Sequence, residues 1–112
     1  MQKFEYRTPR YTVDLPVQLI LADSRIAGRC REISREGMAV EFSEPVQVEA
    51  CGTVSMIYKS LMLELRVAVA HNGKKADGLR FLFETDEDRG SVERLVTLLA
   101  GSTGQRGPVL VR

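Results

Sequence analysis

Apolar residues occupy every second position along much of this chain, and this alternation limits the possible folds more than any other feature. The first such segment carries them at odd positions: Val13, Leu15, Val17, Leu19 and Leu21. Successive side chains of a strand point to opposite faces of a sheet, so the segment is predicted to be a strand with one buried face. Because Pro16 has no backbone N–H, this strand should lie at an edge, or the Pro16 nitrogen should face away from the neighbouring strand.

The same alternation returns in later segments that are separated by short turns. Further strands are predicted within residues 25–33, 38–42, 54–58, 61–69 and 79–83. Asn72 and Gly73 favour a hairpin turn, because both residues tolerate positive φ, and Lys74 and Lys75 should lengthen it. Six or so short antiparallel strands without helices between them predict a mainly all-β domain, either a sandwich or a barrel.

The apolar period changes near Thr85. Beyond it, apolar residues follow the spacing of one helix face: Val92, Leu95, Val96 and Leu99. Thr85 can cap the start of a helix, the acidic residues 86–88 suit its positive end, and Gly101 can end it. We therefore expect one amphipathic helix over about residues 86–100, packed on the β-domain or on a partner.

The 112 residues suit a single domain. Residues 1–11 are expected to form a flexible N-terminal arm that carries arginines, and residues 12–101 the β-domain with its helix. Residues 102–112 contain glycine and proline and are expected to form a loose C-terminal tail.

Charge and composition exclude several classes of function. Sixteen basic against fifteen acidic residues give a net charge of +1, which offers no bulk attraction to nucleic acid or to a membrane surface. Without a signal peptide or an apolar run of about 20 residues, the chain is expected to be cytoplasmic and not inserted in a membrane. Cys30 and Cys51 should then be reduced thiols, and with His71 as the single histidine we expect no metal site and no cofactor.

Catalytic signatures are missing from the sequence. Ser34 stands in no nucleophile motif, and His71 is predicted beside a hairpin turn. The sequence contains no glycine-rich phosphate loop of the nucleotide-hydrolase type. We therefore expect a protein that is not an enzyme.

Two arginines before the first strand suggest that the chain binds an anion. Arg7 and Arg10 flank Pro9, which stiffens the segment and keeps Thr8 extended. The planar guanidinium group matches phosphate oxygens bidentately, and it also matches the O6/N7 edge of guanine. The alternative is a solvated basic terminus without a ligand.

A polar turn between the second and third strands supplies further ligand-binding groups, Glu32-x-Ser34-x-x-Gly37. A carboxylate can accept hydrogen bonds from the N1–H and N2–H₂ groups of guanine, and a serine hydroxyl can bond a phosphate oxygen or a base atom. Gly37 permits positive φ or lets the backbone approach a ligand closely. The alternative is an ordinary β-turn in which serine and glycine are turn formers.

The order of these motifs resembles the PilZ domain family. Its members have an R-x-x-x-R arm, a first strand, and D/N-x-S-x-x-G between the second and third strands. A later strand with a G-x-R-F-like sequence then leads into a C-terminal helix. Here the arm lies at residues 5–10, the turn at 32–37 and Gly-Leu-Arg-Phe at 78–81, so the resemblance covers roughly residues 5–100. Glu32 stands where the family has Asp or Asn, and Tyr6 stands at the position of the first arginine.

The resemblance implies a six-stranded antiparallel β-barrel of PilZ type with a C-terminal helix, and cyclic di-GMP as the ligand. The implied ligand-binding residues are Arg7, Arg10, Glu32, Ser34 and Gly37, with Tyr6, Arg35 and Gly78 as further candidates. The arm should become ordered on binding and so signal to a protein partner that controls motility, biofilm formation or secretion.

Two other functions remain open at this stage. A PilZ-fold adaptor that binds a protein and no cyclic di-GMP would use its helix face or the outer face of its barrel. A small barrel that binds RNA or DNA would need aromatic side chains on a basic face, whereas only 6% of the residues are aromatic. We therefore expect no nucleic-acid polymer as a partner.

Overall fold

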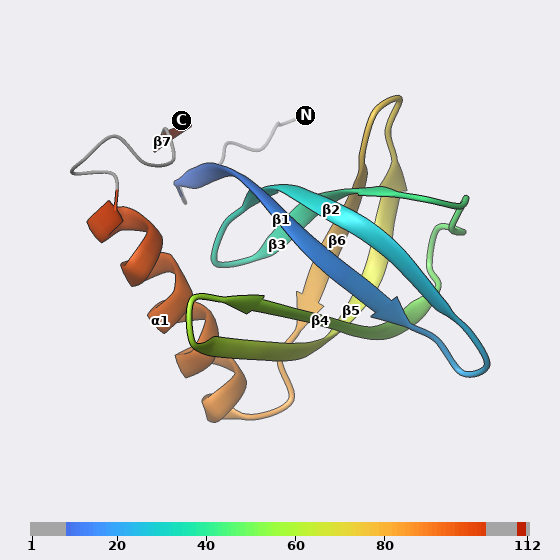
Figure 1. The fold of residues 1–112 in the computed structure, drawn as a ribbon. Coiled ribbons are helices and arrows are strands. Elements are labelled where there is room, and N and C mark those ends of the chain that lie inside the picture. The colour runs from blue at the N-terminus through green and yellow to red at the C-terminus, as the bar shows by residue number, and fades with distance from the viewer. Residues whose placement is uncertain (1–8, 103–109, 112) are drawn as a thin grey trace, which may run out of the picture.

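The computed structural model describes residues 9–102 and 110–111. Six main strands are followed by one helix and a two-residue strand. In chain order these are β1 (Arg10–Ile20), β2 (Arg25–Ile33), β3 (Gly37–Phe42), β4 (Cys51–Tyr58), β5 (Leu61–Asn72), β6 (Asp77–Leu82), α1 (Asp86–Ser102) and β7 (Leu110–Val111). Each predicted strand and the predicted helix are present (Figure 1).

The sheet closes on itself. Its strand order is β2-β3-β6-β5-β4-β1, every neighbouring pair is antiparallel, and β1 also pairs with β2. The fold is therefore the six-stranded antiparallel barrel with a C-terminal helix, and the sandwich is excluded. Closure pairs the strand edges that an open sheet would expose.

Two boundaries differ from those expected for the arm and the tail. β1 begins at Arg10, inside the expected arm of residues 1–11, and Tyr11 pairs with Ile33 and buries its side chain. β7 lies inside the expected tail of residues 102–112 and pairs with the first two residues of β1. The expected strand was started at Val13, although Tyr11 continues the same alternation two residues earlier.

Pro16 does not mark an edge strand. β1 pairs with β2 along most of its length, and it pairs with β4 from Val17 to Ile20. Pro16 lies opposite Arg29 of β2, one residue before the pairing with β4 begins. The missing N–H thus falls where only one neighbouring strand is hydrogen-bonded, which is where a proline is tolerated inside a sheet.

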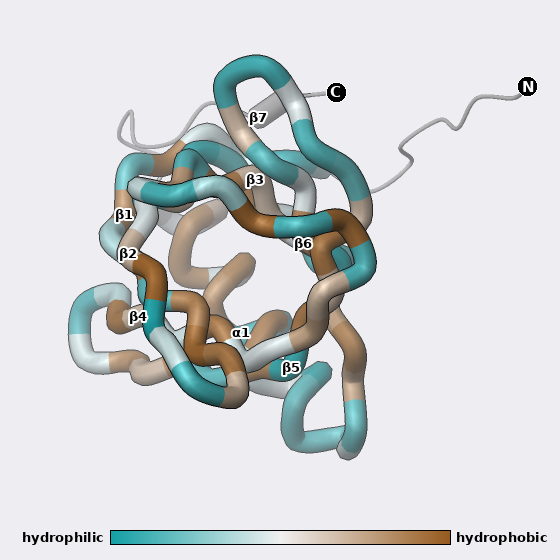
Figure 2. The backbone as a smooth tube through the Cα atoms, turned by 90° about the vertical axis from the view of Figure 1, so that its right-hand side faces the viewer, coloured by the Kyte–Doolittle hydropathy of each residue, from teal (hydrophilic) through white to brown (hydrophobic). Residues whose placement is uncertain are grey.

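The core is built from the inward-facing side chains of all six strands and from one face of α1. Figure 2 looks through the ring of strands toward α1, which lies behind them. The helix contributes four fully buried residues: Val92, Leu95, Val96 and Leu99. The apolar face of α1 therefore packs on the barrel, and the suggestion that this face binds a partner protein is wrong.

The start of α1 is fixed by reciprocal capping. The hydroxyl oxygen of Thr85 accepts a hydrogen bond of 3.1 Å from the backbone N–H of Asp88. In return, the Asp88 carboxylate accepts from the backbone N–H groups of Glu84 and Thr85, at 2.9 and 3.3 Å. This confirms Thr85 as the capping residue, and an acidic residue three positions later completes a capping box.

Candidate functional site

A groove of about 430 Å³ lies over the outward-facing positions of β3 and β6, beside the end of β2. Its charged and polar lining residues include Arg10, Glu32, Ser34, Glu36, His71 and Arg80. Small residues lie between them: Gly37, Ala39, Ala70, Ala76 and Gly78. Ile33, Met38 and Leu79 complete the lining. The groove thus combines charged side chains with several small residues, which leave room for a flat ligand.

Five of the predicted ligand-binding residues line this one groove: Arg10, Glu32, Ser34, Gly37 and Gly78. Arg35 does not line it, although its neighbours on both sides do. Tyr6 and Arg7 lie outside the described residues. Residues from the first strand, the turn and the sixth strand therefore meet at one place although they are far apart in the sequence.

The turn between β2 and β3 is tight and held by two hydrogen bonds. The backbone N–H of Ser34 donates to the carbonyl oxygen of Gly37 at 2.9 Å. The Ser34 hydroxyl oxygen accepts from the backbone N–H of Glu36 at 3.0 Å. Because this hydroxyl acts as an acceptor in the turn, its own proton is available to donate to an anionic ligand.

Gly37 is needed for a reason other than backbone conformation. The described glycines have no positive φ, so the first of the two roles expected for Gly37, a positive φ, is wrong. A Cβ at this position would instead collide with the carbonyl oxygen of Leu79 on β6. The backbone N–H of Phe81 also donates to the carbonyl oxygen of Glu36 at 3.0 Å. Gly37 therefore lets β6 lie close against the turn.

Arg10 and Glu32 form an ion pair in the wall of the groove. The Nη1 atom of Arg10 lies 3.2 Å from Oε1 of Glu32, and about a third of each side chain is exposed (35% and 33%). The carboxylate expected to hold a guanine is thus paired with the arginine expected to bind a phosphate. A partly exposed pair of this kind is worth only about 0–1 kcal/mol, so a ligand can rearrange it at low cost.

A β-bulge in β2 directs Glu32 into the groove. Cys30 is opposite Val40 on β3, but Glu32 is opposite Ala39, so Arg31 is an extra residue in the strand. Strict alternation from the buried Cys30 would place Glu32 in the core and Ile33 outside. The bulge reverses this arrangement, buries Ile33 and turns the Glu32 carboxylate outward.

A second β-bulge has the same effect on His71 in β5. Val69 is opposite Leu79 of β6, but His71 is opposite Gly78, so Ala70 is the extra residue. The imidazole ring lies against Gly78, where a Cβ would overlap the ring. His71 is therefore exposed in the groove instead of being directed inward like Val69.

Sequence reasoning missed His71, Arg80 and Glu36 as groove residues. The only sequence signal for Arg80 was its place in the Gly-Leu-Arg-Phe strand, and the register that sets it opposite Gly37 appears only in the sheet. His71 was noted beside a hairpin, and the bulge that exposes it leaves no mark in the apolar pattern. Glu36 was recognised as part of the turn, but no ligand-binding role was predicted for it.

Arg35 points to the helix instead. Its Nε atom donates to Oε2 of Glu93 at 2.8 Å, and this contact holds the pKa of Arg35 above its usual value. The ion pair joins the turn beside the groove to α1. Arg35 is thus a link between two elements, not a lining residue.

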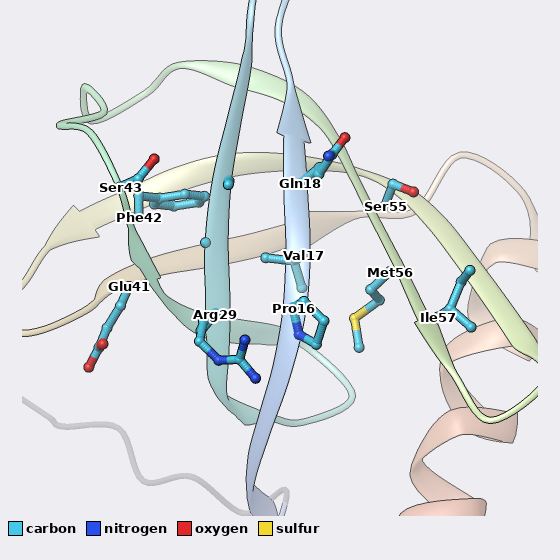
Figure 3. Close-up of a pocket in the computed structure, with 12 residues that line it drawn as sticks. Pro16, Val17, Gln18, Arg29, Glu41, Phe42, Ser43, Ser55, Met56 and Ile57 are labelled. Atoms are coloured by element: carbon cyan, nitrogen blue, oxygen red, sulfur yellow. The ribbon is translucent and has the colours of Figure 1, made fainter.

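A larger pocket of about 640 Å³ lies over β1 to β4 (Figure 3). The close-up shows the Phe42 ring at one side and Arg29 and Glu41 at another. Both charged residues are close to groups of opposite charge, because Arg29 binds Asp14 at 2.6 Å and Glu41 binds Arg31 at 3.1 Å. None of the predicted ligand-binding residues that the structure describes lines this pocket, so the smaller groove is the candidate site.

Within residues 9–102 and 110–111, no three His, Cys, Asp or Glu side chains come together as a possible metal site. In the same part of the chain, no helix is both long and apolar enough to cross a membrane.

Comparison with known proteins agrees with the fold. The family model described as the PilZ domain matches residues 5–100. No curated protein matches the sequence. The PilZ domain of CeSA from a cellulose-synthesizing bacterium is similar, with a TM-score of 0.71 and 19% identity over 81% of this chain and 97% of that one.

Two longer proteins are also similar in structure. MrkH of K. pneumonia, solved as a complex with c-di-GMP, has a TM-score of 0.75 and 12% identity over 93% of this chain and 56% of its own. The inhibitor of motility MotI/DgrA of Bacillus subtilis has a TM-score of 0.69 and 15% identity, covering 95% and 55%. This chain therefore spans about half the length of these two proteins, and the similarity concerns the fold.

Proposed function

The chain belongs to the PilZ domain family, and on that premise we propose that it is a receptor for cyclic di-GMP that signals to a protein partner. The observation that carries the proposal is that Arg10, Glu32 and Ser34 line one groove. These side chains come from β1, β2 and the turn that follows it. If Arg10 belonged to a solvated terminus and Ser34 to an ordinary turn, nothing would require their side chains to line the same groove.

The chemistry of the groove suits a guanine nucleotide with phosphates. Arg10 can bind phosphate oxygens or a guanine edge through its planar fork, and the Ser34 hydroxyl can donate to a phosphate. Glu32 can accept from the N1–H and N2–H₂ groups of guanine once its pair with Arg10 rearranges. The small floor around Gly37 and Gly78 leaves space for a flat base.

The signal would pass through the elements that meet beside the groove. In this proposal Arg7 closes over the ligand together with Arg10, and Tyr6 contacts it from the same arm. The turn is joined to α1 by the Arg35–Glu93 ion pair, and β7 pairs with the residues that begin β1. Ligand binding would therefore change the surface near both termini, which a partner in motility, biofilm or secretion control would recognise.

A second function, as an adaptor that binds no cyclic di-GMP, is favoured by one observation. Ile57 and Met62 lie opposite each other on β4 and β5, and more than half of each side chain is exposed (57% and 58%). A pair of apolar side chains on the outer face of the hairpin suits contact with a protein. The charge pair of Arg10 and Glu32 would then serve only to hold β1 against β2.

Titration calorimetry with cyclic di-GMP tests the receptor proposal. We expect binding with a micromolar or tighter dissociation constant, weakened about 10- to 100-fold in both Arg10→Ala and Ser34→Ala, since each removes a charge-assisted hydrogen bond. Arg25→Ala is the control, because Arg25 is exposed and bonds only Gln18 among the described residues. No heat up to about millimolar ligand would reject the receptor and favour the adaptor.

A further inference from the structure

We propose that Arg80 of β6 is a further ligand-binding residue of the groove. This inference rests on the proposed function and assigns a phosphate-binding role to a residue outside the arm and the turn. It follows from the place of Arg80 in the groove, from the charges around it and from its lack of an ionic partner in the described residues.

Arg80 lies on the outer face of the barrel, where its neighbours leave space around its side chain. Its partners across the sheet are both small, Gly37 on β3 and Ala68 on β5. The side chain is exposed and lines the groove that also contains Arg10 and Ser34. Because its neighbours have little or no side chain, the guanidinium group of Arg80 has room to turn toward a ligand lying on the floor of the groove.

Arg80 adds positive charge to the groove, which favours an anionic ligand. Arg10 and Glu32 offset each other as an ion pair, and Glu36 adds a second carboxylate to the lining. Among the described lining residues, Arg80 is the second positive charge, and its removal would leave the two carboxylates with Arg10 as the one arginine beside them. The loss of Arg80 would therefore weaken the attraction between the groove and a ligand with two phosphates.

Arg80 also differs from the other two arginines near the groove, because both of those form ion pairs. Arg10 is paired with Glu32 and Arg35 with Glu93. Arg80 forms no ion pair with any residue in the described part of the chain, so binding a phosphate would break no ion pair there. A guanidinium in this state can bind a phosphate bidentately at little cost.

The experiment is calorimetry with cyclic di-GMP on wild type, Arg80→Ala, Arg80→Lys and Arg94→Ala. We expect Arg80→Ala to bind about 10- to 100-fold more weakly, because it loses a charge-assisted bond to the ligand. Arg80→Lys should fall between wild type and Arg80→Ala, because it keeps the charge and loses the planar fork. Arg94 is exposed on α1 and outside the groove, so Arg94→Ala should bind like wild type.

The outcomes separate this inference from the proposed function. If wild type binds and Arg80→Ala binds equally well, the role of Arg80 is refuted while the receptor stands. If wild type does not bind, both are refuted. Thermal unfolding of each variant checks that the exposed substitution at residue 80 leaves the barrel folded, so that a loss of affinity can be assigned to the groove.

Discussion

Gly37 illustrates at the scale of one residue how a proposed ligand-binding motif and a folding requirement share the same position. Its missing Cβ leaves room for the backbone of β6, and the groove lies directly over this contact. The same is true of Gly78, which makes room for the His71 ring. Glycines in this groove therefore shape its floor through the packing of the barrel, before any ligand is present.

We expect Gly37→Ala to lower the free energy of unfolding by about 1–3 kcal/mol, because the added methyl group meets a backbone carbonyl that cannot turn away. Gly90→Ala is the matched control on α1, where a Cβ meets nothing within 4 Å. Relief of the helix penalty of glycine should raise its unfolding free energy by up to about 1 kcal/mol. Urea unfolding of the three proteins measures both values, and an unchanged Gly37→Ala variant would contradict this explanation.

At the scale of elements, α1 completes the core instead of serving as a free surface. Its four fully buried residues join the inward-facing side chains of the strands, and its first turn is capped by Thr85 and Asp88. The Arg35–Glu93 ion pair joins this helix to the turn beside the groove. Any ligand-dependent movement of the turn would therefore reach α1 directly.

The cap can be tested without touching the core. We expect Thr85→Ala to lower the free energy of unfolding by about 0.5–2 kcal/mol, because the backbone N–H of Asp88 loses its acceptor. Thr97→Ala is the control, since Thr97 is exposed in the middle of α1 and alanine favours the helix there. Thermal or urea unfolding distinguishes them, and equal stability of the two variants would show that the cap is unimportant.

At the scale of the whole molecule, the closed barrel keeps Cys30 away from solvent while Cys51 stays exposed. Burial raises the pKa of the Cys30 thiol to about 12, so the folded protein contains almost no reactive thiolate at this position near pH 8.

A chromogenic disulfide reagent at pH 8 should therefore label one thiol per folded chain and two after unfolding in denaturant, since the chain has two cysteines. Cys51→Ser should abolish the fast reaction and leave a slow one, limited by opening of the barrel. Rapid labelling of Cys30 in folded Cys51→Ser would mean that the barrel opens far more readily than its closed sheet implies.

The local pattern of the sequence was enough to predict the strands, the helix and its cap. Alternation between apolar and polar residues marks a half-buried strand wherever it occurs, and the change of period beyond Thr85 marks the helix. Each strand, the helix and each motif depends on residues that are close together in the sequence. The meeting of the arm, the turn and the last strand was implied only by the resemblance to the PilZ family, because these three motifs are far apart in the sequence.

Only the tertiary structure decided which side chains enter the groove. The bulges at Arg31 and Ala70 shift the alternation by one residue and turn Glu32 and His71 outward, although the period of each strand predicts the opposite. The Arg10–Glu32 pair and the place of Arg80 depend in the same way on which strands are neighbours. A bulge is set by the pairing with the partner strand, and no short-range pattern in one strand records it.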